Sequence, residues 1–445
     1  MLDIRISQAQ VVNEGTISTQ DVGIKDGRIH AIGNDLSHLD AREVIDAAGR
    51  HLLPGMIDDQ VHFREPGLTA KGNIATESAA AVAGGITTFF DMPNVKPATL
   101  DSDALEAKFA VAAGRAHANH AFYLGASNDN LEAIKTLDPN QTCGIKIFMG
   151  ASTGNMLVDD PEILEGIFKH APTPIVTHCE DTPMILENEA RWRERFGEDV
   201  PFSEHGLIRS REACIKSSRL AIDLATRNGT QLHVLHLTTA EEMALFKAGP
   251  MKGKQITAEV CAHHLWFSDT DYDTRGSLIK CNPAVKTAED RAALRAAVMD
   301  GRIDIIATDH APHTWEEKQN PYFKAPSGLP LVQHALLSLL DQAQDGIYDL
   351  ATLVQKTSHN VADRFSIVDR GYIREGAFAD LVLVDLNGET SVTRDNVLYK
   401  CGWSPFDGVT FKARIDATFV NGVKAYDGKT VNPVANGQRL SFNRG

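Results

Sequence analysis

The chain has 445 residues, 43% hydrophobic and 23% charged, which is typical of a globular protein with a large core. The net charge is -15, and no basic patch offsets it, which argues against nucleic acid or a membrane surface as a partner. The sequence also has no signal peptide and nothing near the roughly 18 apolar residues of a membrane helix, so we expect a cytoplasmic protein.

Both ends of the chain carry patterns typical of β-strands. Near the N-terminus, Asp26-Gly27 supplies a turn signal between two alternating runs of apolar and polar residues. The C-terminal end repeats this pattern, with Asn421-Gly422 between two runs. We therefore expect residues 1–52 and 375–445 to fold together as one composite β-domain.

The middle of the chain, residues 53–374, alternates short apolar runs with helical patterns such as SREACIKSSRLAIDLATRNG, as a parallel sheet requires. The eight expected strands lie in LLPGMIDDQVH, GITTFFDMP, HAFYLGAS, GIKIFMGA, PIVTHCE, QLHVLHLT, ITAEVCAHH and DIIATDH. Eight such units over about 320 residues predict a TIM-type (β/α)8 barrel with insertions. A doubly wound open sheet is the alternative, but no GxGxxG motif follows the first strand to favour it.

Polar side chains gather at the ends of these strands, where a TIM barrel places its active site. They are Gln60, His62 and Arg64 after the first strand, Asn94 after the second, Lys146 in the fourth, His178 and His236 at the ends of the fifth and sixth, and Asp309 and His313 after the eighth. Histidine and aspartate are suitable ligands for zinc and similar ions. Because all of these residues share one rim of the expected barrel, they indicate a functional site.

Each of these residues also has an ordinary structural explanation. A single histidine at a strand end is often a hydrogen-bonded structural group, and a buried lysine usually extends its amine to water. Asp309 could cap the following helix, and Arg64 could pair with Glu65. The arrangement of the whole set on one rim favours the functional interpretation.

The chain resembles the amidohydrolase superfamily and, within it, the dihydroorotases, over nearly its whole length. The resemblance is carried by DGRIHAIG, DAAGRHLLPGMID, HFREPG, DMPN, THCED, KCNPAVK, ATDHAPH and KCGWSPFDG, in this order. It implies an enzyme that opens a cyclic amide with the help of one or two zinc ions.

The resemblance also assigns metal ligands. They would be His62, Lys146, His178, His236 and Asp309, with Lys146 carboxylated by carbon dioxide and Asp309 also moving a proton in catalysis. Gln60 stands where the family usually has a histidine, and its amide is a weaker zinc ligand than imidazole. The first metal site could therefore be weak, empty or filled by a metal that accepts oxygen. His233 and the pair His263-His264 lie outside the ligand pattern, and we interpret the pair as structural.

The resemblance further suggests the substrate. Arg64, Asn94 and His313 match residues that bind the ring carboxylate in dihydroorotases, and Asn282 matches one that contacts the pyrimidine ring. Allantoinase-like sequences tend to lack a basic residue at position 64, and a ring carboxylate requires a cation. The expected reaction is therefore the reversible hydrolysis of (S)-dihydroorotate to N-carbamoyl-L-aspartate in pyrimidine synthesis, by a homodimer.

Two loops should border this pocket, the ASTGNML segment at 151–157 and the APSG segment at 325–328, which departs from the usual dihydroorotase version at Ser327. Two alternatives for the function stay open. An allantoinase or hydantoinase would share the metal apparatus and act on another ring. A catalytically silent dihydroorotase-like subunit that scaffolds aspartate transcarbamoylase should have lost several ligands, whereas only Gln60 is altered here.

Overall fold

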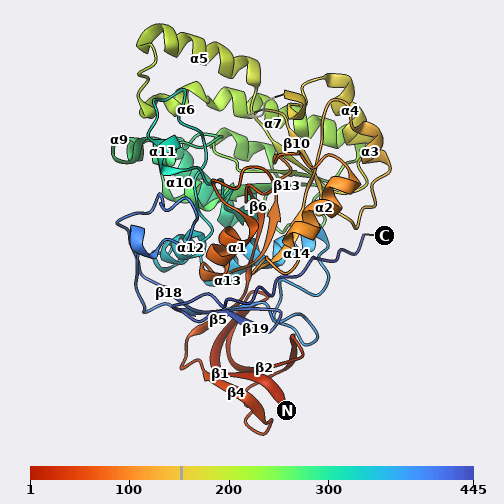
Figure 1. Cartoon of the computed structure of the whole chain (residues 1–445), viewed down its shortest axis with the longest axis vertical. Helices are drawn as coiled ribbons and strands as arrows, with labels where there is room; N and C mark the ends of the chain where they lie inside the picture. Colours follow the sequence, from red (N-terminus) through yellow and green to blue (C-terminus); the bar gives the residue numbers. More distant parts are fainter. Residues whose placement is uncertain (151–153, 445) are drawn as a thin grey trace.

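The computed structural model describes residues 1–150 and 154–444. Figure 1 shows a barrel with its surrounding helices, stacked on a smaller β-rich part that contains the N-terminus. Across these described residues, no helix combines the length and the apolar character needed to cross a membrane.

The barrel consists, within the described residues, of eight parallel strand positions. They are β6 (Met56–Val61), β7 (Ile86–Asp91), β8 (Asn119–Phe122) continued by β9 (Leu124–Gly125), β10 (Ile145–Phe148), β11 (Ile175–His178), β12 (Leu232–Val234), β13 (Ile256–Cys261) and β14 (Ile305–Ala307). The ring closes because Val61 and His310 form a parallel bridge, and the amide of His62 donates to the carbonyl of His310 at 2.7 Å. The closed ring confirms the TIM-type barrel and excludes the doubly wound open sheet.

Helices lie between and around these strands. They are α1 (Ile74–Ala83), α2 (Ser102–Ala112), α3 (Leu131–Lys135), α4 (Pro161–His170), α5 (Thr182–Phe196), α6 (His205–Ile208), α7 (Arg211–Asn228), α8 (Ala262–Trp266), α9 (Tyr272–Arg275), α10 (Ala288–Asp300), α11 (Trp315–Lys318), α12 (Ala335–Gln344), α13 (Leu350–Val354) and α14 (Asn360–Phe365). The expected helix after the fifth strand is α7. It begins after Ser210, whose hydroxyl accepts from the amide of Ala213, and ends at Gly229 in the left-handed conformation.

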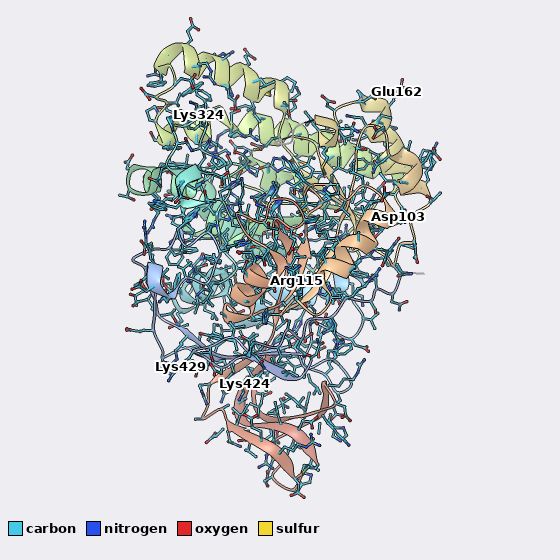
Figure 2. The ribbon with its side chains drawn as sticks, in the orientation of Figure 1. Asp103, Arg115, Glu162, Lys324, Lys424 and Lys429 are labelled. Carbon is cyan, nitrogen blue, oxygen red and sulfur yellow. The ribbon has the colours of Figure 1, made fainter. Side chains whose placement is uncertain are left out.

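The β-rich part is one mixed sheet built from both chain ends, as predicted. Its strand order is β19-β18-β15-β5-β1-β2-β3, and β4 pairs with β1. The strands are β1 (Leu2–Asn13), β2 (Thr16–Lys25), β3 (Arg28–Gly33), β4 (Ala41–Asp46), β5 (His51–Pro54), β15 (Leu381–Asp385), β18 (Arg414–Val420) and β19 (Val423–Tyr426). Figure 2 labels Lys424 on this sheet, where its amine lies 2.5 Å from Glu43 of β4. The sheet therefore joins the two chain ends, while the division at residues 52 and 374 stays a prediction.

Both predicted hairpin turns are present. Asp26 and Gly27 join β2 to β3, and Asn421 and Gly422 join β18 to β19, all with φ between 50° and 77°. Asparagine, aspartate and glycine tolerate this left-handed conformation better than other residues. The two turns also touch, because a Cβ at Gly422 would lie 2.7 Å from the Cα of Gly27.

An apolar cluster fills the lower part of the barrel. Phe90 of β7, Tyr123 between β8 and β9, and Leu235 just after β12 pack there against Phe365 of α14. Cys143 belongs to the same cluster and lies two residues before the start of β10, so the cluster reaches the amino end of the strands. The polar strand ends therefore lie at the opposite rim.

Candidate functional site

Asp309 is the point where the first and last strands bring predicted site residues together. Its Oδ1 accepts from Gln60 Nε2 at 3.1 Å and lies 3.2 Å from His62 Nε2. Burial alone would raise the pKa of Asp309, but the hydrogen bond and charge of His62 lower it overall. Asp309 does not cap a helix, because Thr314 is the cap residue of α11. Its carboxylate is therefore a buried anion held by two neighbours.

Lys146, His178 and His236 lie on the neighbouring strands β10 to β12 or directly after them. The rings of His178 and His236 meet edge to face, with centroids 4.5 Å apart. Lys146 is only 1% exposed, so its amine does not extend to solvent, and it lies 4.6 Å from the ring centroid of Phe148. Burial lowers the pKa of Lys146 to about 8. A sizeable fraction of this amine is therefore neutral near pH 8, the form that can react with carbon dioxide.

The chemistry of these side chains fits a divalent metal ion. Burial lowers the pKa of both His178 and His236, which keeps their imidazoles in the neutral, ligating form. His236 Nδ1 is buried and has no hydrogen-bond partner among residues 1–150 and 154–444. His178 Nε2 lies 2.7 Å from Glu180 Oε2, so the ring is oriented by a carboxylate. His178, His236, Lys146 and Asp309 could therefore hold an ion.

Gln60 has a different role from the histidine that the family usually places there. Its amide nitrogen faces Asp309, and its oxygen lies 3.9 Å from Cys261 Sγ. An amide N–H does not ligate a metal ion. In this arrangement Gln60 orients the carboxylate of Asp309 through a hydrogen bond.

Three predicted site residues have a strained backbone. Arg64, His236 and Asp309 have φ values of 69°, 41° and 53°, in the left-handed region that non-glycine residues seldom adopt. Such strain costs on the order of 1 kcal/mol or more per residue and concentrates at functional sites. These three positions therefore point to this rim as the functional part of the barrel.

Arg64 is the centre of a cluster of nitrogen donors beside Asp309, together with His313 and with Lys71, whose amine pairs with Glu317 at 2.8 Å. It is 8% exposed and donates from Nε to the carbonyl of Pro312 at 3.1 Å. Glu65, the alternative partner, pairs instead with Arg115, labelled in Figure 2, at 2.9 Å. Burial lowers the pKa of Arg64 to about 10, so its guanidinium stays charged at neutral pH. Arg64 is therefore a buried cation that no carboxylate neutralises by direct contact among the described residues.

His313 lies between Arg64 and Lys71. Lys71 Nζ donates to His313 Nδ1 at 3.0 Å, so the proton of the neutral ring is on Nε2, which donates to the carbonyl of Ser327 at 3.1 Å. Arg64 NH2 lies 3.1 Å from the same Nε2. Two proton-bearing nitrogens thus converge here, and an anion beside them would accept from Arg64 and compete with the Ser327 carbonyl for the N–H of His313.

Lys71 lies four residues after the HFREPG segment, and no pattern in the sequence marks it as a site residue. The expected APSG loop does lie beside His313: a Cβ at Gly328 would come within 3.0 Å of His313 Cδ2 and 2.5 Å of the Ala311 carbonyl. Of the ASTGNML loop, residues 151–153 lie outside the described residues.

The two asparagines predicted to contact substrate are placed differently. Asn94 Oδ1 lies 2.8 Å from His62 Nδ1, so it orients this imidazole rather than contacting Arg64. Asn282 Oδ1 is buried and has no hydrogen-bond partner within the described residues. It therefore retains a free acceptor for a ligand N–H.

Two other groups of side chains could also bind a metal. The potential ligand atoms of Asp59, His233 and Glu259 lie within 4.8 Å of one another, as do those of Cys261, His263 and His264. Neither group contains a predicted ligand. His264 Nε2 lies 3.1 Å from the carbonyl of Pro283, while both nitrogens of His263 lack a partner in the described part of the chain.

Comparisons with known proteins agree on the family. Residues 51–425 match the amidohydrolase family. The chain is 32% identical to a dihydroorotase of Methanosarcina mazei over 92% of this chain and 91% of that protein, and 30% identical to an allantoinase of Desulfitobacterium hafniense over 97% of each. Its structure matches an L-hydantoinase (dihydropyrimidinase) of Arthrobacter aurescens with a TM-score of 0.94 and 27% identity, over 99% of this chain and 100% of the other. The chain belongs to the amidohydrolase family, as an enzyme of its cyclic amide hydrolase branch.

Proposed function

We propose that the enzyme is a dihydroorotase, which reversibly hydrolyses (S)-dihydroorotate to N-carbamoyl-L-aspartate in pyrimidine synthesis. The observation that carries this proposal is the buried, unneutralised Arg64 guanidinium beside Asp309, with the neutral ring of His313 next to it. A buried guanidinium facing a second N–H donor matches a carboxylate, which accepts two hydrogen bonds at once. Dihydroorotate carries such a group on its ring, whereas hydantoin and allantoin rings do not.

The metal centre would be held by Lys146, His178, His236, Asp309 and His62, with zinc as the ion that suits these ligands. Carboxylation of Lys146 would convert a buried cation into an anionic oxygen ligand, which removes the cost of burying the ammonium. A divalent ion here would supply Lewis acidity, which lowers the pKa of water and polarises an amide carbonyl.

The protein's own residues account for binding and proton transfer. Arg64 and His313 would hold the ring carboxylate, and this contact would present the ring amide to Asp309. Asp309 would accept a proton from the attacking water as a C–O bond forms at the carbonyl carbon. It would then donate this proton to the ring nitrogen as the C–N bond breaks. Gln60 holds Asp309 Oδ1 in place for both transfers.

A substrate panel tests this proposal. Purified enzyme would be assayed with dihydroorotate, hydantoin, dihydrouracil and allantoin, at the same zinc concentration. We expect kcat/KM for dihydroorotate to exceed that for the uncarboxylated dihydrouracil by about 10-fold or more, since one charge-assisted interaction contributes roughly 1.5–3 kcal/mol. Faster turnover of hydantoin or allantoin would overturn the assignment in favour of another cyclic amidase.

The number of catalytic ions depends on Gln60. We expect the Gln60→His variant to bind additional zinc at the catalytic centre, because imidazole is a better ligand than an amide that donates to Asp309. Zinc per chain would be counted in wild type and variant after identical dialysis. Gln60→Leu is the matched control, since leucine is neutral, similar in size and has no ligand atom. Equal zinc counts in wild type and Gln60→His would contradict a site weakened by Gln60.

The remaining alternatives make distinct predictions. Hydantoinases and allantoinases share the fold and the overall sequence similarity, so only the Arg64 cluster separates them here. A silent scaffold subunit would lack turnover with every ring in the panel. The expected homodimer stays a prediction, and light scattering of the purified enzyme would measure it.

A further inference from the structure

Three ionisable side chains meet inside the barrel, below the proposed catalytic residues. Asp59 lies on β6, His233 on β12 and Glu259 on β13, and all three are completely buried. His233 Nε2 lies 3.3 Å from Asp59 Oδ2 and 3.5 Å from Glu259 Oε2. Two carboxylates and an imidazole therefore face one another away from bulk solvent.

The facing atoms have no hydrogen-bond partners in the described residues. This applies to both carboxylate oxygens of Asp59, to His233 Nε2 and to Glu259 Oε2. Leaving one buried polar atom unsatisfied costs about 1–3 kcal/mol, and more if it is charged. Native proteins seldom retain several such atoms together, and an unobserved ion is a common explanation.

The other polar atoms of His233 and Glu259 make contacts that orient the facing atoms. His233 Nδ1 lies 2.8 Å from Thr257 Oγ1, so this contact aims Nε2 at the two carboxylates. Glu259 Oε1 accepts from the backbone amide of His236 at 3.0 Å, which leaves Oε2 facing His233. The arrangement resembles a metal site in which an outer contact orients each ligand.

We propose that Asp59, His233 and Glu259 bind a second divalent metal ion of the zinc class, distinct from the proposed catalytic centre. Ligands about 2.0–2.2 Å from a tetrahedral zinc ion lie roughly 3.3–3.5 Å apart. The two distances from His233 Nε2 fall in this range. The charge also matches, because the two carboxylates carry the charge that a divalent cation neutralises. The same carboxylates raise the pKa of His233 to about 8 against the effect of burial, so the ion would replace a proton on this ring.

A single proton is the competing occupant. A proton on His233 would neutralise only one of the two carboxylates, and a second proton, on Glu259, would be needed to neutralise the other. Burial and the charge of Asp59 raise the pKa of Glu259, which reflects this repulsion. A proton would also leave most of the facing oxygens without a donor, whereas one ion would contact all three side chains.

This ion would have a structural role beyond the proposed hydrolysis. It would join β6, β12 and β13, which are not all neighbours in the barrel. Through Glu259 it would also fix the amide of His236, whose φ of 41° is strained. The ion bound by Asp59, His233 and Glu259 would thus hold the backbone of His236, a proposed ligand of the catalytic metal, in place.

Anomalous diffraction from the wild-type enzyme tests the site directly. The enzyme would be expressed with zinc, and its crystals measured above and below the zinc absorption edge. We expect an anomalous peak enclosed by Asp59, His233 and Glu259, separate from any peak near His178. A map with a catalytic peak and none between these three residues would overturn the proposal and favour the proton.

Variants then tie the ion to its ligands. Asp59→Asn keeps the side-chain volume and removes a charge, so we expect zinc to fall by about one ion per chain and the inner peak to disappear. His178→Asn is the control, since it weakens the catalytic centre and should leave the inner peak in place. Asp59→Asn protein that retains the inner peak would show that the carboxylate is not a ligand.

Discussion

Replacing Asp309 by asparagine is expected to lower kcat by about 10²- to 10⁴-fold, the contribution that general acid–base catalysis typically makes. The substitution keeps the volume of the side chain and its contact with Gln60, but it removes the group that would accept and donate the proton. Initial rates of dihydroorotate hydrolysis, measured together with a thermal melt, give the result. A variant with near wild-type rates would contradict the assignment of Asp309.

Because Asp309 is also a proposed ligand, loss of metal must be separated from loss of proton transfer. Zinc would be counted in the same preparation, and the rate measured again at saturating zinc. If the variant holds the wild-type amount of zinc and still lacks turnover, the loss of activity results from the loss of proton transfer. Asp273→Asn, at an exposed position on α9, is the matched control and should keep wild-type rates.

The barrel could be predicted from the sequence because each strand carries its own signal. Apolar runs of four to eight residues between helical patterns mark buried parallel strands wherever they occur. The two hairpins were equally local, since Asp26-Gly27 and Asn421-Gly422 specify their turns without help from distant residues. The order of strands around the ring then follows from right-handed βα connections.

The ends of the strands were predicted less accurately than their positions along the chain. The seventh expected run included His263 and His264, but β13 ends at Cys261 and both histidines lie in α8. Apolar neighbours continue through this boundary, so the pattern gives no sign that the backbone turns. The candidate site was unaffected, because neither histidine was assigned as a ligand.

Contacts between distant strands could not be read from the sequence. Asp59 and His233 meet because the register of β6 shifts between Asp58 and Val61, and the tilt of the strands sets which positions share a level inside the barrel. The pairing of His313 with Lys71 depends likewise on how two loops pack. A motif can identify a residue, but such partners appear only in the folded chain.

Removal of the Arg64 guanidinium is expected to act on substrate choice more than on chemistry. Arg64→Ala should raise KM for dihydroorotate by about 10- to 150-fold, which corresponds to losing a charge-assisted hydrogen bond of 1.5–3 kcal/mol. Dihydrouracil, which lacks the carboxylate, should show little change in kcat/KM. The difference between the effects on kcat/KM for dihydroorotate and for dihydrouracil measures the interaction of Arg64 with the carboxylate. Any general damage to the site would affect both substrates.

Two further variants separate charge from geometry. Arg64→Lys keeps a cation but cannot present the planar pair of donors, so it should recover only part of the loss. Lys71→Met removes the donor that fixes His313 Nδ1 and should also raise KM for dihydroorotate, since the ring could then place its proton on either nitrogen. An unchanged KM in Arg64→Ala would show that the cluster does not recognise a carboxylate, and the enzyme would then act on an uncharged ring.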